Sequence, residues 1–144
     1  MKIFFTCSPK KLFELREYYL AIHRSLLSEG HDVVADWLKS GIERHSPTGI
    51  RTKISRKEFY QQLERSIEDC GILLVEGTVD SMSLGWQIAK ALEKNKKIVF
   101  LQIIQEDSPP IHPFIEGVMN ESIHFSQYSL ENIGEVLATV LKWD

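Results

Sequence analysis

The segment that most limits the fold is residues 71–91, where an apolar run, a polar turn and a helical pattern follow one another directly. Residues 72–75 are Ile-Leu-Leu-Val, which is the length and composition of a buried strand. Apolar residues then recur every three or four positions, at Leu84, Ile88 and Ala91. A buried strand, a polar turn and a helix N-terminus form the ligand sites of open α/β sheets. We therefore expect the binding site of this protein at residues 76–83.

Length and composition predict one soluble domain spanning residues 1–144. Hydrophobic residues make up 43% of the chain and charged residues 26%, and the net charge is −3. This charge offers no general attraction to nucleic acid or to an anionic membrane, and no apolar run approaches the length of a membrane span. The two cysteines, Cys7 and Cys70, are too few for a disulfide framework, so we expect reduced thiols and a cytoplasmic location.

Strand and helix patterns alternate along the whole chain. Strands are predicted at residues 2–7, 31–36, 72–75, 98–101 and 122–125. Helices are predicted from Ser8-Pro9 to Gly30, from Ser55 to Asp69, over 83–94, briefly over 114–119, and after Ser129. Residues 39–54 lack periodicity and are expected to form a long loop or lid. The fold class is therefore α/β, a three-layer sandwich with a five-stranded parallel sheet, flavodoxin- or Rossmann-like, in the order 2-1-3-4-5.

The motifs of several common α/β functions do not occur in this sequence. It contains neither GxGxxG nor a P-loop, the turn after the first strand lacks the glycine of a flavin-phosphate loop, and the first strand does not end in acidic residues. The five histidines do not have the spacing of metal ligands. We therefore expect neither a cofactor nor a metal.

The polar turn and the helix after it carry the groups that suit an anionic ligand. Ser81 and Ser83, together with the free amides of a helix N-terminus, would form an anion cradle, although either serine would equally serve as a helix cap. Gly85 would let a ligand or a neighbouring backbone approach closely. Gln87 would project back over the same cleft.

Three further side chains near this turn have two interpretations each. Glu76 and Asp80 are at positions where most proteins have solvated turn residues, but both would also reach a ribose. Cys7 is expected to act as a small apolar residue, because a nucleophilic thiol needs a neighbouring base.

The sequence also resembles a known family at this segment. The matching residues are Val75-Glu76-Gly77-Thr78, then Ser-Met-Ser-Leu-Gly-Trp-Gln-Ile-Ala at 81–89, and Lys-Ile-Val-Phe at 97–100, together with the opening Met-Lys-Ile-Phe-Phe-Thr-Cys-Ser at 1–8. In order and spacing they are similar to the nucleoside 2-deoxyribosyltransferase superfamily, especially its branch of 2′-deoxynucleoside 5′-monophosphate N-glycosidases. The resemblance covers about residues 1–101.

The resemblance implies a nucleoside or nucleotide ligand at the carboxyl ends of the strands. It assigns ligand contacts to the end of the first strand, to the first helix and to the serine-glycine turn, which would receive a 5′-phosphate: Thr6, Cys7, Ser8, Tyr19, Ser81, Ser83 and Gly85. The glutamate that attacks or stabilises the anomeric carbon in this family falls at Gln87, whose amide is a very poor nucleophile. The family's loop with glycine and arginine is replaced by Ser-Pro-Lys-Lys at 8–11, and its aspartate falls at Leu63, beside Glu64.

Three functional hypotheses follow. The first is a nucleoside- or nucleotide-binding protein, a pseudoenzyme that is degenerate in N-glycosidic bond cleavage. The second is an active N-glycosidase or deoxyribosyltransferase in which Glu76, Asp80 or Glu64 supplies the carboxylate. The third is an interaction scaffold anchored by the tryptophans Trp37, Trp86 and Trp143. Relatives of this kind imply a homodimer or a higher homo-oligomer. A TIR-like domain shares the size and architecture, but it too would need a glutamate at the site.

Overall fold

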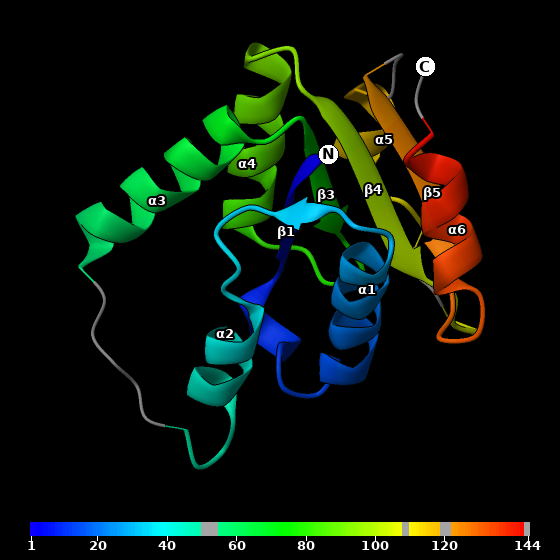
Figure 1. The fold of residues 1–144 in the computed structure, drawn as a ribbon, viewed down its shortest axis with the longest axis horizontal. Helices are drawn as coiled ribbons and strands as arrows, with labels where there is room; N and C mark the ends of the chain where they lie inside the picture. The colour runs from blue at the N-terminus through cyan, green and yellow to red at the C-terminus, as the bar shows by residue number, and fades with distance from the viewer. Residues whose placement is uncertain (50–54, 108–109, 119–121, 143–144) are drawn as a thin grey trace.

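The computed structural model describes residues 1–49, 55–107, 110–118 and 122–142. Its centre is a sheet of five parallel strands in the order β2-β1-β3-β4-β5 (Figure 1). In chain order the strands are β1 (Lys2–Cys7), β2 (Asp32–Val33), β3 (Ile72–Glu76), β4 (Lys97–Ile103) and β5 (Ile123–Tyr128). This confirms the predicted fold class and strand order. Strand β1 pairs with β3 and not only with β2, so the strand order reverses between β1 and β3. Open α/β sheets bind ligands at such a switch point.

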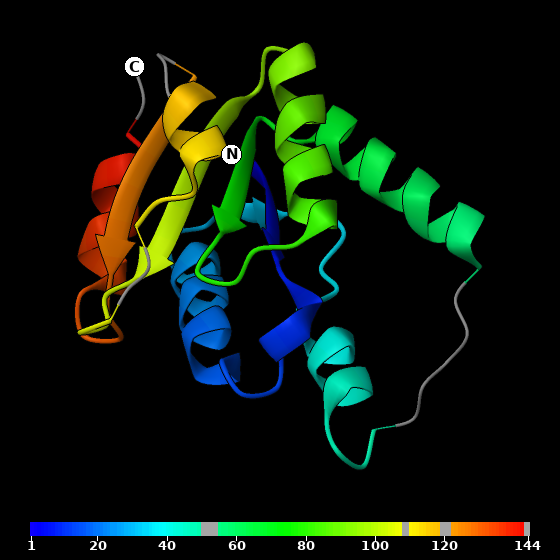
Figure 2. The same ribbon diagram turned by 180° about the vertical axis from the view of Figure 1, so that it is seen from behind.

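Helices cover both faces of the sheet. In chain order they are α1 (Arg16–Ser28), α2 (Leu38–His45), α3 (Arg56–Asp69), α4 (Met82–Glu93), α5 (Pro113–Val118) and α6 (Ile133–Val140), and a 3-10 turn (Pro9–Lys11) precedes α1. Helices α1 and α6 lie on the face seen in Figure 1, whereas α3, α4 and α5 lie on the face seen in Figure 2. Helix α2 lies beyond the end of β1.

The core consists of two apolar clusters, one on each face, because side chains alternate along a strand. Ile3 and Phe5 pack with α1 and α6, while Phe4 between them packs with α3 and α4. All five residues of β3 are buried, as expected for a central parallel strand.

The local helix signals explain several boundaries. The side chain of Ser55 accepts a hydrogen bond from the Glu58 amide at 3.4 Å and begins α3 as predicted. Gly30 follows α1 with φ +76°, the left-handed conformation that glycine adopts easily after a helix. Ser81 caps α4, because its hydroxyl accepts from the Leu84 amide at 3.2 Å.

Two predictions near the N-terminal part of the chain were wrong. Ser8 does accept a hydrogen bond from the Lys10 amide, but it caps only the 3-10 turn, and α1 begins at Arg16. The intervening Leu12 is buried in the core beside Gly41 of α2, so the chain turns inward there before the helix starts. The second strand is limited to Asp32–Val33, paired with only two residues of β1.

The prediction of a long irregular loop at residues 39–54 was also wrong for the first part of that segment, which belongs to helix α2. Its eight residues are too few for periodicity to stand out in the sequence, and buried contacts of Leu38 and Gly41 hold the helix in place. Residues 50–54 lie outside the described residues.

The last helix begins after Asn132 rather than Ser129, and the Asn132 side chain accepts a hydrogen bond from the Ser129 amide at 2.8 Å.

Candidate functional site

Helix α4 separates two pockets at the carboxyl edge of the sheet. The Gln87 pocket has a volume of about 380 Å³ and lies between the end of β1 and helices α2, α3 and α4. Its lining includes Thr6, Cys7, Asp36, Trp37, Arg44, His45, Phe59, Leu63, Ser83 and Gln87. The Ser81 pocket has a volume of about 840 Å³ and lies on the other side of α4, against α5. Its lining includes Lys10, Lys11, Thr78, Asp80, Ser81, Gly85, Phe100, His112 and Phe114.

The helical repeat explains this division. Ser83 and Gln87 are four residues apart and share one side of α4, and Ser81 and Gly85 share another. Residues two apart do not face the same side of a helix, so Ser83 lines the Gln87 pocket and Ser81 lines the Ser81 pocket. The sequence motif is therefore continuous along the chain but divided in space.

Gln87 is one of three buried polar residues in the described lining of the Gln87 pocket, together with Thr6 and Ser66. Its side chain is 2% exposed, and its Nε2 donates a hydrogen bond to Ser83 Oγ at 3.0 Å. The Oε1 atom at the other end is buried and has no partner in the described part of the chain. Whichever way the amide is turned, Ser83 satisfies only one of its ends. A buried amide with one open end is ready to pair with a ligand.

The charges around the Gln87 pocket are mixed. Asp36 is the one carboxylate among the described lining residues, and its Oδ2 is 2.8 Å from Nε2 of His23. Arg44 and His45 come from the last turn of α2. Trp37 forms part of the wall, and its indole is fixed by a hydrogen bond of 3.0 Å to the Phe5 carbonyl. The pocket therefore combines an aromatic wall, a free amide end, the carboxylate of Asp36 and the guanidinium of Arg44.

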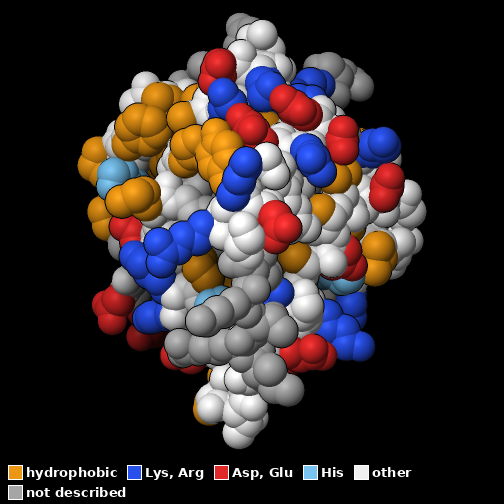
Figure 3. Space-filling view, turned by 90° about the vertical axis from the view of Figure 1, so that its left-hand side faces the viewer, with side chains coloured by type: hydrophobic (Ala, Val, Ile, Leu, Met, Phe, Trp, Pro, Cys, Tyr) orange, Lys and Arg blue, Asp and Glu red, His pale blue; other side chains and the backbone are white. Residues whose placement is uncertain are grey.

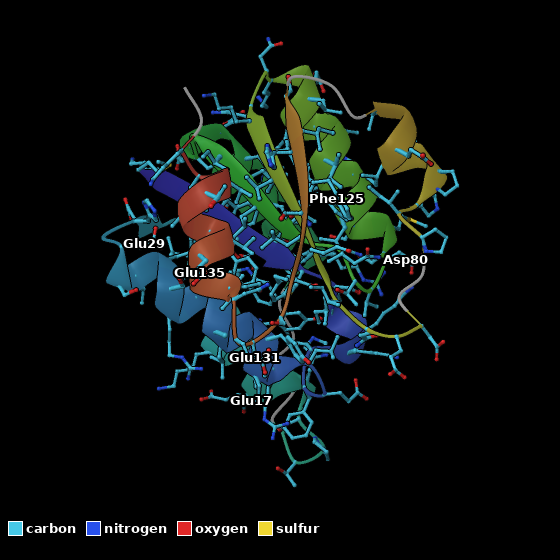
Figure 4. The ribbon with its side chains drawn as sticks, turned by 90° about the vertical axis from the view of Figure 1, so that its right-hand side faces the viewer. Glu17, Glu29, Asp80, Phe125, Glu131 and Glu135 are labelled. Carbon is cyan, nitrogen blue, oxygen red and sulfur yellow. The ribbon has the colours of Figure 1, made fainter. Side chains whose placement is uncertain are left out.

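In the Ser81 pocket, Ser81 and Asp80 have structural contacts within the protein that account for them without a ligand. Ser81 uses its hydroxyl to cap α4. Asp80 lies at the surface (Figure 4). Its side chain is 80% exposed, and its Oδ1 forms an ion pair with Lys10 Nζ at 3.5 Å. A Cβ at Gly85 would meet nothing within 4 Å, so no neighbouring backbone requires a glycine there. A Cβ at Gly77 would instead collide with the ring of Phe100.

Glu76 is buried, not solvated, and lies on the opposite face of the sheet from Gln87. Its side chain is 0% exposed and packs towards α1 and β5. The hydroxyl and the amide of Thr78 both donate to its Oε1. Since Thr78 Oγ1 also accepts from the Ile103 amide at 2.8 Å, its proton is directed at the carboxylate.

Burial raises the pKa of Glu76 from 4.5 to about 7, and the hydrogen bonds from Thr78 oppose this shift. Its Oε2 and the hydroxyls of Tyr19 and Tyr128 are all buried without a direct hydrogen bond in the described structure. Burial and the nearby Glu76 charge raise the pKa values of both phenols and of the Cys7 thiol. A thiol with a raised pKa is a poor nucleophile, in line with the apolar role expected for Cys7.

The remaining predicted residues are distributed between pocket and core. Thr6 and Cys7 line the Gln87 pocket, whereas Ser8 is buried in its capping role and Tyr19 lies in the core. Glu64 accepts from the Tyr60 hydroxyl at 3.3 Å on the surface of α3. Sequence reasoning missed Arg44 and Tyr128, because each comes from a segment without a recognisable motif. Thr78 lies inside the predicted turn, but its hydrogen bond to Glu76 was not predicted.

Hydrophobic side chains gather over part of the face shown in Figure 3. Phe59, Tyr60, Met82 and Phe114 are among the exposed large apolar residues of α3, α4 and α5. Trp86 is half-buried and its ring lies 5.1 Å from that of Tyr60. Trp143 lies outside the described residues.

No group of three His, Cys, Asp or Glu side chains in the described ranges has the arrangement of a metal site. Among the helices described, none is both long enough and apolar enough to cross a membrane.

Comparison with known proteins gives a result at the level of the fold. No family model and no curated protein matches the sequence. Among 45 matching chains of solved structures is the CMP N-glycosidase BcmB of Clostridium botulinum, with a TM-score of 0.65 and 16% identity over 97% of this chain and 99% of that one. The chain shares the fold of that enzyme. At this identity the likeness concerns the fold alone, which agrees with the fold implied by the sequence resemblance.

Proposed function

We propose that this protein binds a nucleoside or nucleotide in the Gln87 pocket and is degenerate in N-glycosidic bond cleavage. The observation that carries the proposal is the buried Gln87 amide, held at one end by Ser83 and open at the other. A ribose hydroxyl or a base amino group would complete its hydrogen bonds. The pocket volume of about 380 Å³ falls within the range of small-ligand sites. Further support comes from the shared fold with a CMP N-glycosidase.

The loss of cleavage activity is inferred from the need of this reaction for a carboxylate beside the sugar. Cleavage of an N-glycosidic bond develops positive charge on the sugar, which a carboxylate close to the anomeric carbon stabilises. Gln87 is neutral, and Asp36 is already engaged with His23. The acids considered as replacements line other regions: Glu76 is buried on the opposite face, Asp80 lines the Ser81 pocket, and Glu64 lies on the surface of α3.

Binding is tested by isothermal titration calorimetry with the four ribonucleoside 5′-monophosphates, their deoxy forms and the parent nucleosides. We expect at least one to bind to the wild type. Gln87→Leu removes both ends of the amide with little change in volume, and we expect it to weaken binding about tenfold or more. Gln105→Leu, at an exposed position away from both pockets, is the matched control. If none of these compounds binds, the proposal is wrong.

Activity is tested by chromatographic detection of free base. The wild type is expected to release none above the uncatalysed rate, whereas Gln87→Glu supplies a carboxylate facing the pocket and is expected to create measurable release. Gln105→Glu introduces the same chemical change at the exposed control position. Rapid base release by the wild type would contradict degeneracy and would support the alternative of an active N-glycosidase or deoxyribosyltransferase.

A further inference from the structure

The connection between β2 and α2 contributes a carboxylate and an aromatic ring to the Gln87 pocket. Asp36 is the one acid among the described lining residues, and 47% of its side chain is exposed, so a ligand can reach it. Trp37, the next residue, forms part of the wall. A hydrogen-bond acceptor and a flat apolar surface therefore belong to the same pocket, from adjacent positions in the chain.

Both side chains are held in place by contacts from other elements. Nε2 of His23, on α1, lies 2.8 Å from Oδ2 of Asp36, and Oδ1 has no hydrogen bond to the described residues. The indole N–H of Trp37 donates to the Phe5 carbonyl at 3.0 Å. The Trp37 ring also packs so closely on Gly41 that a Cβ there would come within 2.6 Å of it. Groups fixed before a ligand arrives lose little conformational freedom on binding, which is the arrangement of a preorganised site.

The backbone that leads into this pair is strained. Ala35 has φ +50°, the left-handed region that a residue with a Cβ adopts only rarely. Ala35 itself lines the Gln87 pocket, directly before Asp36. Strain of this kind is found most often at active sites and ligand clamps, because the surrounding structure must hold it there.

The chemistry of a carboxylate selects among the nucleobases. A carboxylate only accepts hydrogen bonds, and each of its oxygens has two lone pairs, so the contact of Oδ2 with His23 leaves acceptor sites on both oxygens. Guanine has two neighbouring donors, N1–H and the N2 amino group, which match two carboxylate oxygens. Adenine and cytosine have a ring nitrogen lone pair beside their amino group, and uracil has one N–H between two carbonyls. Each of these three bases would turn an acceptor towards the charge of Asp36.

We propose that Asp36 makes the Gln87 pocket selective for a guanine nucleoside, whose base lies against Trp37 and donates to the carboxylate from N1–H and the N2 amino group. This rests on the proposed function and names the base. Asp36 would also have a purely structural role if it only tethers the β2–α2 connection to α1 through His23. A tether affects stability but not the choice of base, so base selectivity separates the two roles.

The first test is isothermal titration calorimetry of the wild type with guanosine, inosine, adenosine, cytidine and uridine. Each is measured as the nucleoside and as its 5′-monophosphate, so that the base preference is obtained with either form. Inosine differs from guanosine only in lacking the N2 amino group. The loss of one hydrogen bond to a charged acceptor should make inosine bind about tenfold to a hundredfold more weakly than guanosine. The other three bases should bind more weakly than guanine.

Asp36→Asn provides the second test, because an amide offers one acceptor and one donor. Xanthosine has a carbonyl where guanosine has the N2 amino group, so this variant should prefer xanthosine to guanosine, whereas the wild type should prefer guanosine. Loss of a structural tether would not reverse this preference. Asp32→Asn makes the same change at an exposed position of β2, outside the described lining of both pockets, and should keep the wild-type preference.

Two results would overturn the proposal while leaving nucleoside binding beside Gln87 intact. One is equal affinity of the wild type for guanosine and inosine, a comparison that does not depend on any variant folding. The other is an Asp36→Asn variant that still prefers guanosine to xanthosine, or that loses affinity for all bases equally, which would place the carboxylate at the sugar or outside the contact. If no nucleoside or monophosphate binds to the wild type, the proposed function is wrong as well.

Discussion

Replacing Glu76 by glutamine should abolish a pH dependence of stability that this one carboxyl creates. The side chain is fully buried, and its pKa is about 7 in the folded protein against an ordinary value of 4.5. Folding therefore favours the protonated form. The stabilisation is fully present below pH 4.5 and is lost as the pH rises through 7.

The size of the effect follows from the difference between the two pKa values. About 2.5 pH units at 1.36 kcal/mol each correspond to roughly 3 kcal/mol, and most of this is lost between pH 5 and 8. The carboxylates with lowered pKa values act in the opposite sense, but only below about pH 4.5: Glu68, Glu93 and Glu131. Glutamine keeps the acceptor for Thr78 and has no charge to desolvate.

Urea unfolding followed by circular dichroism at pH 5, 6, 7 and 8 measures this effect. At pH 8 the Glu76→Gln variant should be more stable than the wild type by about 2–3 kcal/mol, roughly 1 M in the urea midpoint for a domain of this size. At pH 5 the difference should shrink to about 1 kcal/mol or less, because the wild type has then lost only a small part of the stabilisation. Glu106→Gln, at an exposed position, should follow the wild type throughout. Parallel pH profiles for Glu76→Gln and the wild type would refute the argument that burial of this carboxyl controls the dependence.

Three further substitutions test local features of the site by urea unfolding. Gly77→Ala forces a methyl group against the Phe100 ring and should destabilise the protein by about 1–3 kcal/mol, so an unchanged midpoint would show that the ring moves freely. Gly85→Ala meets open space inside α4 and should instead stabilise by about 0.5–1 kcal/mol; a loss would mean that this helix is not formed as described. Ser81→Ala removes the α4 cap and should cost about 1 kcal/mol while leaving calorimetric ligand binding beside Gln87 unchanged, and weaker binding would implicate the Ser81 turn in that pocket.

Local signals were sufficient for most of the architecture. Short apolar runs separated by amphipathic segments are typical of parallel α/β sheets, and this pattern predicted five strands in the order that the structure has. Ser55 and Gly30 mark helix ends through their own side-chain and backbone chemistry, which depends on only a few neighbouring residues. Helix α2 was missed because eight residues give a weak periodic signal and its packing partners are distant in the chain.

The site was predicted as a segment of sequence, and only tertiary packing decided how that segment is used. The sequence by itself predicted a binding site at residues 76–83 and the neutral Gln87 on the helix that follows. It could not show that α4 would direct Ser83 and Gln87 into one pocket and Ser81 into another, because that depends on which helices flank α4. Nor could it show that Glu76 would be buried near Tyr19 and Tyr128, residues brought together by α1 and β5. Burial and pKa depend on neighbours from the whole fold, whereas strand and helix patterns are set by residues close in the chain.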